Sequence, residues 1–214
     1  LLSLSSLPRL IEGVDISTFQ GDESVGAIVA FFDGFPLKKR YRKYIIRDIN
    51  HPDDFAMIEE TLTRHFKKLI QSQSEFPNLL VVDGGIGQLN SALKVVQTFS
   101  LPISVLALAK ENEEIYLPGK SVALRLPAEN PSLQFLQRIR NEVHRFVITF
   151  HRVRRNKKMF HSLLDDIPGI GPQRKNLLLS AFDSLTDILD HSPQEISRQL
   201  KIPPQSIIEI QKKL

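Results

Sequence analysis

Residues 78–89 of this 214-residue chain read NLLVVDGGIGQL, a short apolar run that ends at Asp83, followed by paired glycines. The apolar run predicts a buried strand over Asn78–Val82, the glycines predict a turn, and the later spacing predicts a helix over Leu89–Phe99. The next apolar run, Ile103–Ala107, predicts a further strand. Strand, helix and strand in this order are typical of a right-handed crossover between two parallel strands.

Three strands are predicted before this crossover unit. Two apolar runs cover Ile11–Ile16 and Ser24–Phe32, and a more polar run covers Lys39–Ile46. Because these runs follow one another closely, they favour an antiparallel meander. The period of the apolar residues then changes to that of a helix from Phe55 to Leu69.

After the crossover, Ile115–Leu117 and Val122–Leu126 flank a Pro-Gly-Lys turn and predict a small hairpin. Apolar residues at helical spacing predict one long helix from Ser132 to about Arg155. A meander extended by crossovers predicts an α/β domain, a mixed sheet with flanking helices, in the order of the ribonuclease H-like fold.

Beyond this helix every periodic segment is typical of a short helix, so a second, small all-α domain is expected. The predicted organisation is a linker over 1–12, the α/β domain over 13–155, a second linker over 156–161 and the all-α domain over 162–214.

The composition limits the chemistry that the chain can support. It contains no cysteine, so disulfides and thiolate metal sites are excluded, and any metal needs carboxylate, imidazole or carbonyl ligands. The sequence contains no apolar run long enough for a membrane and no signal peptide, so we expect a cytoplasmic protein with no membrane partner.

Two aspartates end strands that are neighbours in the predicted sheet. Asp15 lies at the end of the first strand and Asp83 at the end of the fourth, so we expect both carboxylates in one crevice. His144 lies on the long helix, beside its apolar stripe. Two carboxylates and an imidazole suit Mg²⁺ or Mn²⁺, and such a site suits phosphodiester hydrolysis.

Each of these residues also has an ordinary structural explanation. An aspartate near glycine or serine is typical of a turn or a helix cap, and a single histidine beside an apolar stripe is usually structural. The combination of the three with the order of the strands is what favours a site.

The long helix carries an excess of positive charge. Residues 138–158 hold eight lysines and arginines against a single acid, Glu142. Such a block binds a polyanion through phosphate contacts, although a solvated helix face has the same composition. The cations are Arg138, Arg140, Arg145, Arg152, Arg154, Arg155, Lys157 and Lys158.

The segment LLDDIPGIGPQRK, residues 163–175, predicts a helix, a tight hairpin and a second helix. Gly169 and Gly171 allow the backbone to approach a phosphate, and Arg174 and Lys175 add positive charge. This pattern is typical of a helix-hairpin-helix motif, and an ordinary helical hairpin is the alternative. A second copy has Pro203-Pro204 at its turn, so we expect it to pack against the first and bind phosphate poorly.

Three blocks of the sequence resemble the UvrC family of DNA excinucleases. Residues 13–26 (GVDISTFQGDESVG) resemble its FDIS…QG…SVG block, and residues 81–89 (VVDGGIGQL) resemble its DGGxGQL block. Residues 140–152 (RNEVHRFVITFHR) resemble its RDEAHRFA…HR block. The three occur in the family's order and at compatible spacing, so the chain is identified as the C-terminal half of a member.

The resemblance implies a ribonuclease H-like endonuclease domain followed by a tandem helix-hairpin-helix domain. It implies an Asp-Asp-His triad at Asp15, Asp83 and His144, with the histidine a ligand or a proton-transfer group. It implies a metal-dependent 5′ incision beside a lesion in double-stranded DNA, during nucleotide excision repair with UvrB and, indirectly, UvrA. Asp54 also matches an acidic position of the family, and a carboxylate in a first helical turn is the preferred explanation for it.

The sequence also departs from the family at Val14, Ile86 and Pro203-Pro204. These departures keep a second hypothesis open, a DNA-binding scaffold that is catalytically silent in isolation. A third hypothesis, a protein-interaction domain that adopted the fold, is disfavoured because all three triad residue types are present.

Overall fold

The computed structural model describes residues 7–18, 24–46, 53–165, 167–182 and 185–213. Their side chains are described too, except at 150–161 and 185–186. The chain divides into two compact units, Leu1–Ile148 and Thr149–Leu214. Within the described ranges, no helix has the length and apolar character that crossing a membrane requires.

The first unit is built on a mixed sheet, as the sequence predicts. The strand order is β3-β2-β1-β5-β6-β7, and β4 also pairs with β2. Strands β1, β5 and β6 are parallel, while β2 is antiparallel to β1 and β7 is antiparallel to β6. The strands are β1 (Leu10–Ser17), β2 (Val25–Phe32), β3 (Phe35–Pro36), β4 (Arg42–Ile45), β5 (Leu79–Asp83), β6 (Ser104–Ala109) and β7 (Glu114–Tyr116).

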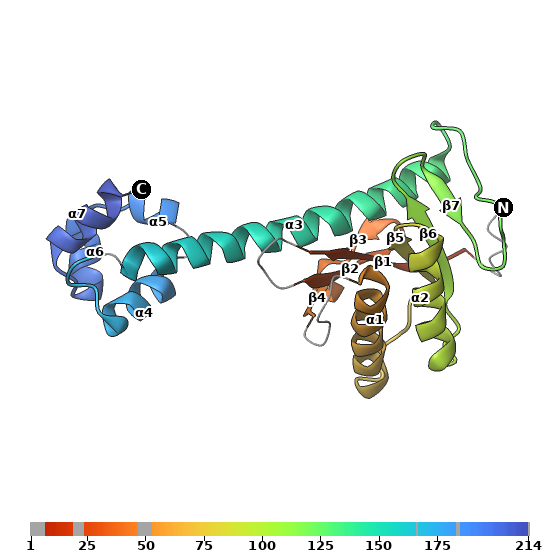
Figure 1. Cartoon of the computed structure of the whole chain (residues 1–214), viewed down its shortest axis with the longest axis horizontal. Helices are drawn as coiled ribbons and strands as arrows, with labels where there is room; N and C mark the ends of the chain where they lie inside the picture. The colour runs from red at the N-terminus through yellow and green to blue at the C-terminus, as the bar shows by residue number, and fades with distance from the viewer. Residues whose placement is uncertain (1–6, 19–23, 47–52, 166, 183–184, 214) are drawn as a thin grey trace. The chain divides into compact units, whose positions relative to one another are not determined.

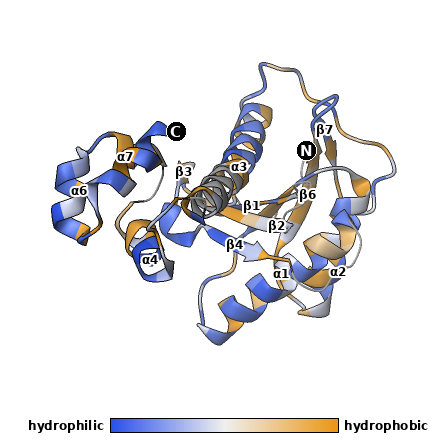
Figure 2. Cartoon of the chain, turned by 60° about the vertical axis from the view of Figure 1, so that its left-hand side comes forward, coloured by the Kyte–Doolittle hydropathy of each residue, from blue (hydrophilic) through white to orange (hydrophobic). Residues whose placement is uncertain are grey.

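Helices cover both faces of this sheet. Helices α1 (Asp54–Gln71) and α2 (Ile86–Thr98) lie side by side on one face (Figure 1). Helix α3 (Pro131–Asp165) packs on the other face with the part of it that belongs to the first unit. In Figure 2, α1 and α2 carry both hydrophobic and hydrophilic positions, as expected of helices with one buried face.

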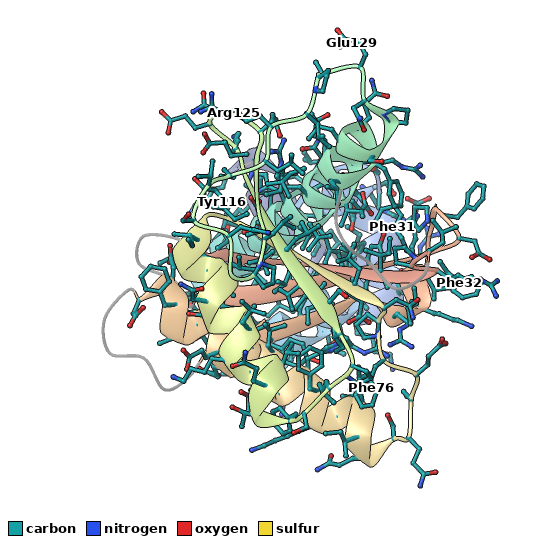
Figure 3. All side chains as sticks on the ribbon, turned by 90° about the vertical axis from the view of Figure 1, so that its right-hand side faces the viewer. Phe31, Phe32, Phe76, Tyr116, Arg125 and Glu129 are labelled. Carbon is teal, nitrogen blue, oxygen red and sulfur yellow. The ribbon has the colours of Figure 1, made fainter. Side chains whose placement is uncertain are left out.

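The alternation of side chains along the strands decides which residues meet α3. Phe31 of β2 is buried and packs edge-on against Phe135 of α3, with ring centroids 5.8 Å apart, whereas its neighbour Phe32 is exposed (Figure 3). On β1 the same alternation puts Gly13 and Asp15 on the α3 face, because successive side chains point to opposite faces.

The opposite face of β1 carries a buried polar network that sequence reasoning missed. Glu12 is fully buried and accepts hydrogen bonds from Arg40 Nη2 at 3.1 Å. Its other carboxylate oxygen lies 2.8 Å from Nε2 of His65 on α1, and His65 Nδ1 lies 2.9 Å from the Tyr44 hydroxyl on β4. A buried carboxylate is stable only when its charge and lone pairs are satisfied, so this network ties α1 and β4 to β1.

Two predicted boundaries in the first unit differ from the structure. Strand β1 begins at Leu10, inside the predicted linker 1–12, because Leu10 and Ile11 are buried in the sheet. The predicted strand Lys39–Ile46 divides into a 3₁₀ turn, η1 (Lys38–Arg40), and β4.

The predicted hairpin forms, although its pairing is limited to one residue pair. Strand β7 pairs with β6, and the segment Val122–Leu126 makes a single bridge, between Leu124 and Ile115. Leu124 and Ile115 exchange backbone hydrogen bonds at 2.8 and 2.9 Å, and Val122, two residues before Leu124, is already 79% exposed.

The predicted linker 156–161 is helical, because α3 continues to Asp165. No glycine or proline interrupts the chain between Pro131 and Pro168, and Leu163 and Leu164 give the helix further apolar residues at its end. The division between the units falls at Ile148 and Thr149, inside the helix.

The second unit is all-α in its described part. Its core joins both predicted hairpins: Ile167 and Ile170 of the first pack in one cluster with Ile202 and Ile207 of the second. The Ser206 hydroxyl also donates to the carbonyl of Pro168 at 3.3 Å, so the expected packing of the hairpins is confirmed. Besides the end of α3, its helices are α4 (Pro172–Ala181), α5 (Leu185–Leu189), α6 (Pro193–Leu200) and α7 (Pro204–Lys212).

Gly13 sets how closely α3 approaches β1. A Cβ atom at Gly13 would lie 2.6 Å from Cγ2 of Ile139 on α3 and 3.3 Å from Cγ2 of Val29. Such distances are well below van der Waals contact, so only glycine lets the helix pack at this depth.

We therefore predict that Gly13→Ala lowers the free energy of unfolding by about 1–3 kcal/mol, the usual range for overpacking a core. Urea denaturation of the wild type, Gly13→Ala, Ile139→Ala and the double variant measures this. The double variant is expected to lose less than the two single variants together, because the new methyl group fills the space that Ile139 leaves. Simple additivity of the two losses would contradict the close approach.

Candidate metal centre and nucleic-acid interface

The two strand-end aspartates lie side by side. The parallel pairing of β1 and β5 aligns Gly13 with Val81 and Val14 with Val82. The next residue on each strand is Asp15 and Asp83, at the end of the sheet from which the crossover helices begin. Both carboxylates lie on the face that α3 covers, because they follow the strand alternation of Gly13 and Val81.

Helix α3 brings His144 to these carboxylates. His144 Nδ1 lies 3.1 Å from Oδ2 of Asp15, and one ligand atom from each of Asp15, Asp83 and His144 lies within 4.8 Å of the others. The imidazole side chain is 51% exposed, whereas the Asp15 side chain is 11% exposed. The cluster is thus open to solvent on the side of the histidine.

Burial dominates the electrostatics of the cluster, and repulsion from Asp15 adds to its effect on Asp83. Burial, and then the charge of Asp15, raises the pKa of Asp83 to about 6. Burial also raises the pKa of Asp15, while its hydrogen bond to His144 acts in the opposite direction. Two carboxylates that both resist ionisation favour any partner that adds positive charge between them.

This donor set fits a divalent cation. Two carboxylate oxygens and one imidazole nitrogen are ligands that Mn²⁺ accepts, and the oxygens alone suit Mg²⁺. A cation at the cluster would also offset the burial and the repulsion from Asp15, which together raise the pKa of Asp83. The described residues therefore fit the metal site that the sequence predicts.

The turn after Asp83 depends on its first glycine. Gly84 has φ +143°, a conformation that other residues rarely adopt, and a Cβ there would lie 2.9 Å from the Gln88 side chain. Gln88 Oε1 accepts a hydrogen bond from the backbone N–H of Gly85 at 3.1 Å. Gln88 therefore supports the turn that carries Asp83.

Arg140 acts on the cluster from a buried position. It is 7% exposed and donates to Glu113 at 2.6 and 3.0 Å, and its positive charge lowers the pKa of Asp83, against the effect of burial. Arg140 was predicted as a phosphate contact, but in the structure its guanidinium is engaged by Glu113. Sequence reasoning missed Glu113, because the run KENEE at 110–114 offers three acids and no signal that selects one.

The other basic residues of α3 are placed only in part. Arg145 donates to Glu142 at 2.7 and 2.8 Å, and the hydroxyl of Tyr41 donates to Glu142 at 2.9 Å. Glu142 therefore lies in a separate group from the carboxylate cluster. Arg138 is exposed, and its guanidinium carbon lies 5.5 Å from the centroid of the Phe31 ring. The other five cations of the block lie on α3 with side chains outside the described residues: Arg152, Arg154, Arg155, Lys157 and Lys158.

Asp54 is the first residue of α1, and its charge contributes to the raised pKa of Asp15. The cap of this helix is the preceding residue, Asp53, whose side chain accepts from the backbone N–H groups of Phe55 and Ala56. Asp54 is thus a first-turn carboxylate, outside the cluster of three potential ligands.

The first hairpin of the second unit has the predicted glycine geometry. Gly169 has φ +82°, and Gly171 precedes α4 without a side-chain cap, so the first N–H groups of that helix have no capping side chain. Arg174 is partly exposed and donates to the Gly169 carbonyl at 2.7 Å. Lys175 is 7% exposed and pairs with Asp165, so its ammonium stabilises the hairpin from inside.

In the comparison with protein-family models, residues 1–148 match the UvrC RNase H endonuclease domain. The matched range ends where the first compact unit ends. The chain therefore belongs to the family of the UvrC RNase H endonuclease domain, and its sheet has the ribonuclease H-like fold.

Curated relatives agree with this assignment. The chain is 44% identical to the UvrABC system protein C of Moorella thermoacetica over 192 residues, covering 88% of this chain and 31% of the relative. It is 41% identical to the protein of that name from Cyanothece sp. over 217 residues, covering 95% of this chain and 35% of the relative. The chain thus spans about a third of the length of these relatives.

Among solved structures, Ciona intestinalis endonuclease V (D234N) in complex with inosine-containing DNA matches with a TM-score of 0.39 and 13% identity. The match covers 49% of this chain and 46% of that one. A likeness at this level carries no functional argument.

The raised pKa of Asp83 predicts how stability depends on pH in the absence of metal. A carboxyl group whose pKa is higher in the folded state than in the unfolded state binds its proton more tightly when folded. The unfolding free energy of the wild type therefore falls as pH rises from about 4 to about 6, and Asp83→Asn removes this loss. We expect Asp83→Asn to be more stable than the wild type at pH 7 by about 2 kcal/mol, and equally stable at pH 4.

Thermal melts across pH, with EDTA present, measure the difference. Asp33→Asn is the matched control, because Arg9 lowers the pKa of that exposed carboxyl and its removal brings no gain at pH 7. Parallel pH profiles for the wild type and Asp83→Asn would show that the pKa of Asp83 is not raised in the folded state.

Proposed function

We propose that the chain is the incising part of a DNA repair endonuclease, which hydrolyses a phosphodiester bond on the 5′ side of a lesion in nucleotide excision repair. The observation that carries the proposal is the convergence of Asp15, Asp83 and His144, in a chain that belongs to the UvrC RNase H endonuclease family. Mn²⁺ or Mg²⁺ is the cofactor that this donor set suits.

A divalent cation at this site would supply Lewis acidity for activating water and neutralising charge on the phosphate. Asp15 and Asp83 are the residues that would hold the cation through their carboxylates. His144, oriented by its hydrogen bond to Asp15 and half exposed, serves as a further ligand or as a proton-transfer group near the leaving oxygen. Arg140, fixed by Glu113, limits the build-up of negative charge around Asp83.

The second unit holds the DNA backbone in this proposal. The uncapped N–H groups of α4, next to Gly169 and Gly171, suit a phosphate, and Arg174 adds charge beside them. Arg145 and the cations of α3 from Arg152 to Lys158 extend the positive charge available for DNA. Such contacts are independent of sequence, which suits an enzyme that acts beside lesions in any context.

UvrB, with UvrA acting through it, is the proposed protein partner. The relatives are named as components of a UvrABC system, which supports assembly with the other two proteins of that system.

The proposal predicts metal-dependent nicking of a lesion-bearing duplex. Incision by the chain, alone or added to a complex of UvrB with that duplex, is expected to require Mn²⁺ or Mg²⁺ and to fall at least ~100-fold in Asp15→Asn, Asp83→Asn and His144→Ala. Product lengths on a denaturing gel give the rate and the side of the lesion that is cut. A 3′ product would contradict the assignment of the incision.

Two matched variants control for general effects of substitution. Asp33→Asn changes an exposed carboxylate and His191→Ala changes an exposed imidazole of the second unit, and both are expected to cut at the wild-type rate. Binding of Mn²⁺ by His144→Ala separates the two roles of the histidine: lost affinity makes it a ligand, whereas retained affinity with lost cutting makes it a proton-transfer group. DNA binding with no cutting under any of these conditions would favour the silent scaffold.

A further inference from the structure

Phe55 is a large apolar side chain that the fold leaves half exposed. It lies in the first turn of α1, and 49% of the residue is accessible to solvent. Its ring lies against Gly87 in the first turn of α2: a Cβ at Gly87 would lie 2.3 Å from Cε1 and 2.6 Å from Cζ of the ring. Only a glycine at this position lets the ring approach the backbone of α2 so closely.

A second exposed apolar residue adjoins this contact. Ile86 directly precedes Gly87 and is 46% exposed. The first turns of α1 and α2 therefore each present one apolar residue to solvent, although the interior helix positions of both elements are buried in the core.

One short chain segment and one side-chain contact place Phe55 and Ile86 near the carboxylate cluster. Ile86 follows Asp83 by three residues, across the Gly84-Gly85 turn. On the other strand, Thr18 follows Asp15 by three residues, and its hydroxyl lies 3.7 Å from the sulfur of Met57 in the first turn of α1. Both connections are short, so the pair borders the same end of β1 and β5 as the aspartates.

We propose that Phe55, with Ile86 beside it, is the platform on which a base of the cut strand stacks, next to the phosphate held at Asp15, Asp83 and His144. The inference rests on the proposed function, because the cluster is what brings a phosphodiester to this edge. A base attached to a neighbouring sugar lies within one nucleotide of that phosphate, and an aromatic face stacks any base without reading its identity.

The platform implies that the nucleotide beside the cut is unstacked from its neighbours. A base inside a regular duplex has both faces covered, so Phe55 contacts it only where the strand is single or locally distorted. Local distortion is what a lesion supplies, so the platform gives the nuclease a preference for opened DNA without any contact to the lesion.

The test compares DNA with and without bases. The whole 214-residue chain is titrated, in Mg²⁺, with a fluorescein-labelled single-stranded oligonucleotide and with an abasic oligonucleotide of equal length, both on a hydrolysis-resistant phosphorothioate backbone. The wild type is expected to bind the oligonucleotide with bases at least about fivefold more tightly than the abasic one. Phe55→Ala and Phe55→Leu are expected to bring this ratio close to one while leaving the abasic affinity unchanged.

The variants separate stacking from packing. Phe55→Leu keeps an apolar side chain against Gly87, so it retains the melting temperature that Phe55→Ala partly loses. Phe55→Tyr keeps the aromatic face and the wild-type ratio, and so does Phe35→Ala, which removes a 73% exposed phenylalanine from β3.

Three outcomes overturn the platform: a wild-type ratio near one, a wild-type ratio in Phe55→Leu, or equal weakening of both oligonucleotides by the Phe55 variants. A shift of the melting temperature by Mn²⁺ distinguishes this failure from failure of the metal site. If the wild type shows that shift, but the ratio of the two affinities is the same in the Phe55 variants as in the wild type, only the platform is overturned. If the wild type shows no shift, the proposed metal site fails.

Discussion

The contact between His144 and Asp15 joins residues 129 positions apart, and the candidate site depends on it. It forms because α3 packs closely on β1, and that packing is possible because Gly13 has no side chain beneath Ile139. The parallel register of β1 and β5 supplies the second carboxylate, Asp83. One helix-to-sheet distance and one strand register thus determine whether two carboxylates and an imidazole share a site.

The carboxylates on the two faces of β1 are in different electrostatic environments. On one face Glu12 is fully buried, and Arg40 and His65 satisfy it with hydrogen bonds, so that face is closed. On the other face Asp15 and Asp83 are crowded together, and only the half-exposed His144 bonds directly to Asp15 among the described side chains. Charge left uncompensated at an open edge is what a metal site requires, and it lowers the stability of the metal-free fold.

The sheet and the convergence of the three candidate site residues could be predicted because each leaves a local signal in the sequence. The apolar run LLVV before Asp83 predicts a buried strand by itself, and Asp15, Asp83 and His144 lie in blocks that resemble a family. The pairing of Arg140 with Glu113 left no such signal, because it depends on how the loop after β6 folds back onto α3. The continuation of α3 through 156–161 was missed because charged residues there mask its helical period.

The most direct test is a crystal of this chain grown with Mn²⁺, with diffraction collected at the manganese absorption edge. We expect anomalous density bonded to carboxylate oxygens of both Asp15 and Asp83, with the His144 imidazole beside it. Density bound to other residues, or two aspartates that turn away from each other and leave the metal to solvent, would contradict a shared metal site at this edge of the sheet.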